Sequence, residues 1–142
     1  MHAFIWMQGV IVTCMTQPAG IRKAERFAAI DVGSNSVKLS LAVRGSGKRP
    51  AVIETARIVS QLGQNAEGDG TLHDQAVERT AEAVAELVSE ARKQDASMIR
   101  AVATSAAREA PNGADLKERV RAIAGIELEI ISGEQEAKLA FQ

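Results

Sequence analysis

The pattern of apolar and polar positions predicts three strands near the start of the chain. Residues 27–30 form a nearly continuous apolar run, which is typical of a strand covered on both faces. Over residues 37–42, apolar and polar side chains alternate with a period of two, which indicates a half-buried strand. A third apolar segment spans residues 51–59, and a glycine-containing turn at 45–48 precedes it. Because the connections are short, we expect an antiparallel meander.

Helical periodicity begins after a loop at 63–70 that is rich in glycine, asparagine and aspartate. Apolar residues then recur at spacings of three and four over about 72–94, which predicts an amphipathic helix. The remaining elements are a strand at 98–103, a helix around 116–123 that ends at Gly125, a strand at 126–130 and a last helix opening at 132–133. This βββαβαβα order predicts an α/β fold with a mixed five-stranded sheet and helices packed on it.

Residues 1–25 are interpreted as a leader that precedes a domain at 26–142. Their apolar patch is too short to span a bilayer and lacks the basic start of a secretory signal. Met1, Met7 and Met15 are alternative starts of the protein. We therefore expect a disordered or misassigned leader and a cytoplasmic protein.

Composition excludes several classes of function. A formal net charge of −1 and 3% aromatic residues argue against binding to nucleic acid or to an acidic membrane surface. One cysteine cannot form an internal disulfide. The two histidines stand apart, so a transition-metal site is not expected. With 142 residues, the chain supports one domain of ordinary size.

The first polar turn follows the first apolar strand. Asp31 ends that strand, and the small residues Gly33, Ser34, Asn35 and Ser36 follow it. Gly33 permits a positive φ and a close approach of ligand to backbone, and consecutive N–H groups in such a turn bind anions. The Asp31 carboxylate is a hard oxygen ligand suited to Mg²⁺ beside phosphate. The same residues are also the ordinary residues of a hairpin turn, and spacing alone leaves both interpretations open.

A second polar turn follows the strand at 98–103. Thr104 and Ser105 offer hydroxyl groups and a helix N-terminus where a phosphate could sit. Arg108, one helical turn later, could pair with a phosphate through two hydrogen bonds, although spacing alone favours a surface arginine.

The third polar turn opens the last helix with Ser132, Glu134 and Glu136. Taken alone, this segment is interpreted as a helix cap, in which the two glutamates interact favourably with the helix dipole. Because parallel strands end at the same edge of a sheet, we expect all three turns to converge there.

Together, the segments 29–36, 100–110 and 130–139 resemble three motifs of the Ppx/GppA family, and the helix containing Glu78 matches as well. The family comprises exopolyphosphatases and guanosine pentaphosphate phosphohydrolases, and the resemblance extends from about residue 26 to the end of the chain. It implies a ribonuclease H-like (actin-type ATPase) fold of two lobes, of which this chain is similar to the first.

The resemblance also implies roles for individual residues. Asp31 and the turn at 33–36 would contact phosphate and Mg²⁺, Arg108 would contact phosphate, and Glu136 would be the general base that orients water. Gln135 departs from the family pattern, in which this position is often acidic. The Ser-Gly-x-x-Glu motif that ends at Glu136 weakens a third interpretation, a sugar kinase or chaperone-type ATPase of the same broad fold.

The implied substrate is inorganic polyphosphate or guanosine pentaphosphate, and the sequence does not distinguish the two. Full-length members are expected to form homodimers. The family's glycine-rich second phosphate loop should follow the last helix, but the sequence ends at Gln142. We therefore expect the isolated chain to hydrolyse polyphosphate poorly or not at all. The alternative is a truncated, non-catalytic remnant that binds phosphate or a partner chain.

Overall fold

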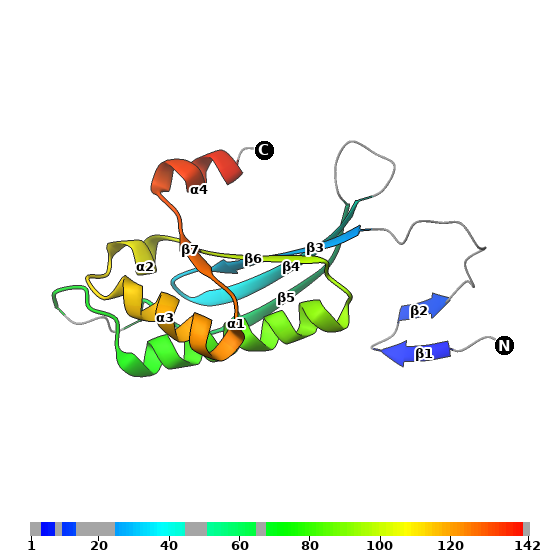
Figure 1. The fold of residues 1–142 in the computed structure, drawn as a ribbon, viewed down its shortest axis with the longest axis horizontal. Helices are drawn as coiled ribbons and strands as arrows, with labels where there is room; N and C mark the ends of the chain where they lie inside the picture. Colours follow the sequence, from blue (N-terminus) through cyan, green and yellow to red (C-terminus); the bar gives the residue numbers. More distant parts are fainter. Residues whose placement is uncertain (1–3, 8–9, 14–24, 45–50, 65–67, 141–142) are drawn as a thin grey trace.

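A five-stranded mixed sheet forms the centre of the computed structural model, which describes residues 4–7, 10–13, 25–44, 51–64 and 68–140 (Figure 1). The strand order is β5-β4-β3-β6-β7. The first three strands pair antiparallel, and β6 and β7 are parallel to β3, which confirms the predicted meander and parallel extension. The strands are β3 (Glu25–Val32), β4 (Ser36–Arg44), β5 (Ala51–Val59), β6 (Met98–Ala103) and β7 (Leu128–Ile130).

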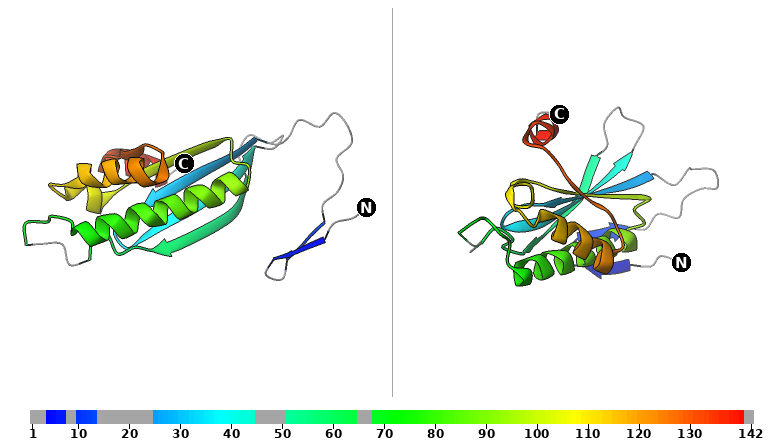
Figure 2. Two further views of the ribbon diagram at one scale, coloured as in Figure 1. Left: turned by 60° about the horizontal axis from the view of Figure 1, so that its bottom comes forward. Right: turned by 60° about the vertical axis from the view of Figure 1, so that its left-hand side comes forward.

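Helices lie on both sides of this sheet. The helices are α1 (Asp74–Lys93), α2 (Ser105–Glu109), α3 (Gly113–Ala124) and α4 (Gly133–Ala140). Figure 2 shows α1 and α3 side by side on one face, with α4 on the opposite side of the sheet. The predicted order βββαβαβα is confirmed within residues 25–140, with α2 as an additional short helix. Among the described helices, none combines the length and apolar content needed to cross a bilayer.

Two short strands precede this arrangement. β1 (Phe4–Met7) and β2 (Val10–Thr13) pair antiparallel within the segment interpreted as a leader. That interpretation of residues 1–25 stays a prediction. The predicted turn at 45–48 and part of the predicted loop at 63–70 lie outside the described residues.

The core lies between the sheet and the layer formed by α1 and α3. In β3, Ala28, Ile30 and Val32 are buried, whereas Ala29 and Asp31 are exposed. The expectation of a strand buried on both faces is therefore wrong, because only alternate side chains of β3 point to the covered face. This alternation leaves Asp31 on the open face at the edge where the parallel strands end.

Candidate active site

Backbone hydrogen bonds connect the segments that follow the three parallel strands. The N–H of Thr104, directly after β6, donates to the carbonyl oxygen of Val32 at the end of β3, at 3.2 Å. The N–H of Ile131, directly after β7, donates to the carbonyl oxygen of Ala103, at 3.1 Å. The predicted convergence of the three polar segments at one edge of the sheet is therefore observed.

The turn after β3 closes through Gly33, whose N–H donates to the carbonyl oxygen of Ser36 at 3.0 Å. Among the described glycines, Gly70 and Gly125 have a positive φ and Gly33 does not, so the turn does not use the positive φ that glycine permits. A Cβ at Gly33 would lie 3.3 Å from the carbonyl oxygen of Ser36. The small size of this residue, rather than its backbone freedom, suits it to the tight turn.

Hydroxyl groups link this turn to its neighbours. The Oγ atoms of Ser34 and Ser105 lie 3.3 Å apart, which joins the turn to the start of α2. Ser36 is buried, and its Oγ accepts a hydrogen bond from Nε of Arg57 at 3.1 Å. Thr104 is the N-cap of α2 but forms no side-chain cap hydrogen bond. Ser34 and Ser105 therefore lie together, whereas the hydroxyl of Ser36 serves a structural contact.

Arg108 and Glu136 are in direct contact. Nη1 of Arg108 donates to Oε2 of Glu136 at 3.1 Å and to the carbonyl oxygen of Ile131 at 3.0 Å. Nη2 of Arg108 lies 3.7 Å from Oε1 of Glu109. The Arg108 side chain is 29% exposed and that of Glu136 is 42% exposed, so both remain accessible to a ligand. This guanidinium joins α2 to the turn that opens α4.

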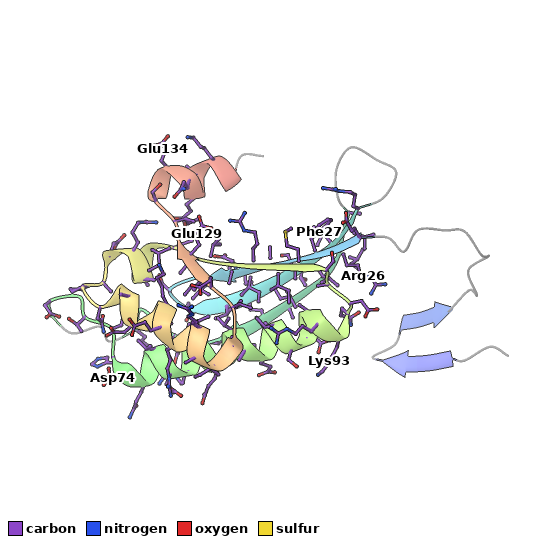
Figure 3. The ribbon with its side chains drawn as sticks, viewed as in Figure 1. Arg26, Phe27, Asp74, Lys93, Glu129 and Glu134 are labelled. Atoms are coloured by element: carbon purple, nitrogen blue, oxygen red, sulfur yellow. The ribbon has the colours of Figure 1, made fainter. Side chains whose placement is uncertain are left out.

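The start of α4 is closed by a reciprocal cap. The N–H of Gln135 donates to Oγ of Ser132 at 3.2 Å, and the N–H of Ser132 donates to Oε1 of Gln135 at 2.9 Å. Glutamine and glutamate both serve in this capping box, so the departure at Gln135 costs the helix little. Glu134 pairs with Lys138 at 2.8 Å and lies on the side of α4 turned away from the sheet (Figure 3).

Asp31 is not part of the Arg108–Glu136 contact. It is exposed and lies between Lys38 and Val102 in the strand register. Within the described residues its carboxylate forms no hydrogen bond or ion pair, and no group of three potential metal-ligating side chains occurs. A single accessible carboxylate still fits Mg²⁺, which commonly takes one or two protein carboxylates and completes its shell with phosphate oxygens and water.

A hollow of about 260 Å³ lies beside the turn, between α2 and the segment that follows β5. Gly63 from that segment lies against Ser34, although the sequence analysis placed residue 63 only in the loop at 63–70 and not among the candidate site residues. A larger hollow of about 640 Å³ at the start of α1 contains none of the predicted site residues. The lining of the smaller hollow is Ser34, Gly63, Gly70, Leu72, Ser105, Ala106, Glu109 and Ala110.

Comparison with known proteins gives consistent matches. The sequence pattern of the Ppx/GppA phosphatase family matches residues 40–142. Exopolyphosphatase 1 of Mycobacterium tuberculosis is 29% identical over 116 residues, which cover 82% of this chain and 34% of that protein. The crystal structure of the Aquifex aeolicus family member has a TM-score of 0.77 at 31% identity, over 84% of this chain and 39% of that chain. An exopolyphosphatase structure from Cytophaga hutchinsonii shares the fold, with a TM-score of 0.74 at 24% identity over 81% of this chain and 36% of that chain.

These matches agree with the architecture described above. The chain spans about a third (34%) of the length of the curated exopolyphosphatase that it matches. Its sheet and helices form the predicted ribonuclease H-like, actin-type ATPase lobe. Because the family pattern covers most of the chain, from residue 40 to residue 142, the chain belongs to the Ppx/GppA phosphatase family.

Proposed function

We propose that the rim formed by the turn at 33–36, Arg108 and Glu136 binds the terminal phosphate of polyphosphate or guanosine pentaphosphate for Mg²⁺-assisted hydrolysis. The direct contact between Arg108 and Glu136 carries this proposal. A guanidinium is suited to hold phosphate oxygens, and the adjacent carboxylate can accept a proton from water. The exopolyphosphatase activity named for a relative supports the substrate class.

In this proposal, the chain's own groups hold the terminal phosphate and activate water. The N–H groups of the turn, the hydroxyls of Ser34 and Ser105, and Arg108 would bind the phosphate oxygens. Water would attack the terminal phosphorus while Glu136 accepts its proton, and the anhydride P–O bond would break as the shortened chain leaves. Asp31 would hold Mg²⁺, which supplies charge neutralisation for the phosphate oxygens.

The Arg108–Glu136 ion pair has a consequence for binding. Nη1 of Arg108 is shared between Ile131 and Glu136. A phosphate that binds Arg108 must either use its remaining donors or replace Glu136. In the second case, binding would release the carboxylate next to the phosphate, where it could act on water.

Titration calorimetry with tripolyphosphate and Mg²⁺ tests the binding role of Arg108. Hydrogen bonds to charged groups contribute about 1.5–3 kcal/mol, so we expect Arg108→Gln to weaken binding at least about tenfold. Arg121→Gln is the matched control, because Arg121 is exposed and pairs with Glu127 outside the site. Equal affinities of the two variants, or no binding by the unchanged chain, would contradict the proposal.

Phosphate-release assays with both substrates, with and without Mg²⁺, test the proposed reaction. Mg²⁺-dependent release from polyphosphate but not from guanosine pentaphosphate would assign the first as substrate, and the reverse result would assign the second. Because the isolated chain is expected to turn over poorly, the assays include a longer form of the protein. Substrate binding with no phosphate release in either form would favour the alternative of a non-catalytic binding lobe.

A further inference from the structure

The segment that follows β5 binds the carbonyl groups of the turn after β3. The N–H groups of Ser60 and Gln61 both donate to the carbonyl oxygen of Asn35, each at 3.0 Å. The N–H of Gly63 donates to the carbonyl oxygen of Ser34 at 2.8 Å. Three donors from one segment therefore hold two consecutive carbonyl groups of the turn.

These bonds also determine where the amide hydrogens of the turn point. In a planar trans peptide, the C=O and N–H bonds point in opposite directions. Fixing the carbonyl of Ser34 therefore directs the N–H of Asn35 away from residues 60–63, and fixing the carbonyl of Asn35 does the same for the N–H of Ser36. Among the described residues, the N–H of Asn35 donates to no acceptor, so it is available to an anion.

Packing holds the segment rigidly against the turn. Leu62 is 1% exposed and anchors it in the core. A Cβ at Gly63 would lie 3.2 Å from Cβ of Ser34 and 3.5 Å from Cβ of Ala106. A methyl group at position 63 would therefore press on Ser34 and displace the turn by a few tenths of an ångström, whereas its contact with Ala106 would be an ordinary one. Gln61 has a φ of 55°, a conformation that residues other than glycine keep only where the surroundings impose it.

We infer that residues 60–63 are a positioning segment, which orients the amide donors of the turn before phosphate arrives. The inference rests on the proposed function, because it assigns these amides to a phosphate ligand. Preorganised donors avoid the cost of ordering the turn on binding. Gly63 acts here through Ser34 and Asn35, and contact of its own with the ligand is not required.

Nuclear magnetic resonance of the ¹⁵N-labelled full chain tests this inference by titration with tripolyphosphate and Mg²⁺. In the unchanged protein, we expect the amide resonances of Asn35 and Ser36 to shift on titration. Gly63→Ala should displace these resonances before any ligand is added and weaken binding at least about tenfold, because the donors lose their orientation. Gly68→Ala is the matched control, since a Cβ there meets no atom within 4 Å.

Binding and turn resonances in Gly63→Ala that match the unchanged protein would overturn the inference. Failure of the unchanged protein to bind would instead overturn the proposed function. Hydrogen exchange of the ligand-free protein gives an independent test, also where Gly63→Ala does not fold. Slow exchange at Ser60, Gln61 and Gly63 supports the positioning segment, whereas exchange as fast as at Gly68 overturns it.

Discussion

Glu136 and Glu134 lie two positions apart on α4, yet their side chains have different partners. Glu136 accepts a hydrogen bond from Arg108 at the rim, whereas Glu134 pairs with Lys138 on the outer side. If Glu136 is the general base, Glu136→Gln removes the proton acceptor and keeps the side-chain size. We expect it to lower the rate of phosphate release from polyphosphate about 10²–10⁴-fold. The rate is to be measured in a form of the protein, this chain or a longer one, that hydrolyses polyphosphate. Glu134→Gln should keep the rate, and equal rates in the two variants would contradict the role.

Gly113 begins α3 where that helix meets α2. A Cβ at this position would lie 2.0 Å from the carbonyl oxygen of Ala107. The backbone would have to move to relieve this steric clash. We expect Gly113→Ala to lower the free energy of unfolding by about 3 kcal/mol or more, measured by urea denaturation. Gly68→Ala should change it by less than about 0.5 kcal/mol, because that site is open. A Gly113→Ala protein as stable as this control would show that the close contact is absent.

Individual residues were predictable where the local sequence or the strand order determines their place. Gly125 follows the last turn of α3 and has a φ of 67°, as expected for a glycine that ends a helix. Arg108 and Glu136 meet because both follow parallel strands that end at the same edge; their proposed roles stay predictions. The approach of Gly63 to Ser34 depends on the path of a non-periodic segment, so no sequence pattern indicated it.

At the scale of elements, the cap of α4 positions the segment that carries Glu136. Ser132→Ala removes the hydroxyl that accepts from the N–H of Gln135. Loss of such a cap costs about 1 kcal/mol, so we expect amide exchange in the first turn of α4 to become about fivefold faster. Gln135→Glu should keep the wild-type exchange rates, because glutamate can serve in the same capping box. Unchanged exchange in Ser132→Ala would show that the cap does not stabilise this helix.

An ion pair between Glu78 and Arg119 joins α1 to α3. Nη2 of Arg119 donates to Oε1 of Glu78 at 2.7 Å, and this hydrogen bonding lowers the pKa of Glu78 below its ordinary value of 4.5. A carboxyl whose pKa is lowered on folding stabilises the protein above its unfolded-state pKa and loses that effect as pH falls through the folded-state pKa. We therefore expect wild type to exceed Glu78→Gln in unfolding free energy at neutral pH.

The difference between the two proteins should shrink as pH falls below about 4.5 and disappear once Glu78 is protonated in the folded protein. Urea denaturation at a series of pH values measures it. Added salt should also reduce the difference at neutral pH, since both side chains are partly exposed. A difference that stays constant down to about pH 3 would contradict a contribution from the charged pair.

Elements were predictable from sequence in proportion to their length and periodicity. The strand at 98–103 and the long helix within 72–94 have the expected positions, because several apolar residues repeat in each. α2 spans five residues, Ser105–Glu109, which is too short to display a helical period. Its place at the rim matters nevertheless, because it carries both Ser105 and Arg108.

At the scale of the whole molecule, the two faces of the sheet differ in what covers them. α1 and α3 cover one face, whereas α4 stands on the opposite side (Figure 2). A hollow of about 420 Å³ separates α4 from Ala29 and Val102 on that face. The apolar run at 27–30 led us to expect burial on both faces of β3. This expectation failed because sequence alone does not reveal what covers each face of the sheet. The fold class nevertheless followed from element order, since a strand order with helical crossovers restricts the topology.

A crystal structure of the chain with tripolyphosphate and Mg²⁺ tests the central claim most directly. We expect a terminal phosphate against the N–H groups of the turn at 33–36, within hydrogen-bond reach of the Arg108 guanidinium and next to Glu136. We also expect Asp31 to be the residue that would hold Mg²⁺. Phosphate bound instead in the hollow at the start of α1, with the Arg108–Glu136 contact intact and the turn empty, would contradict the account.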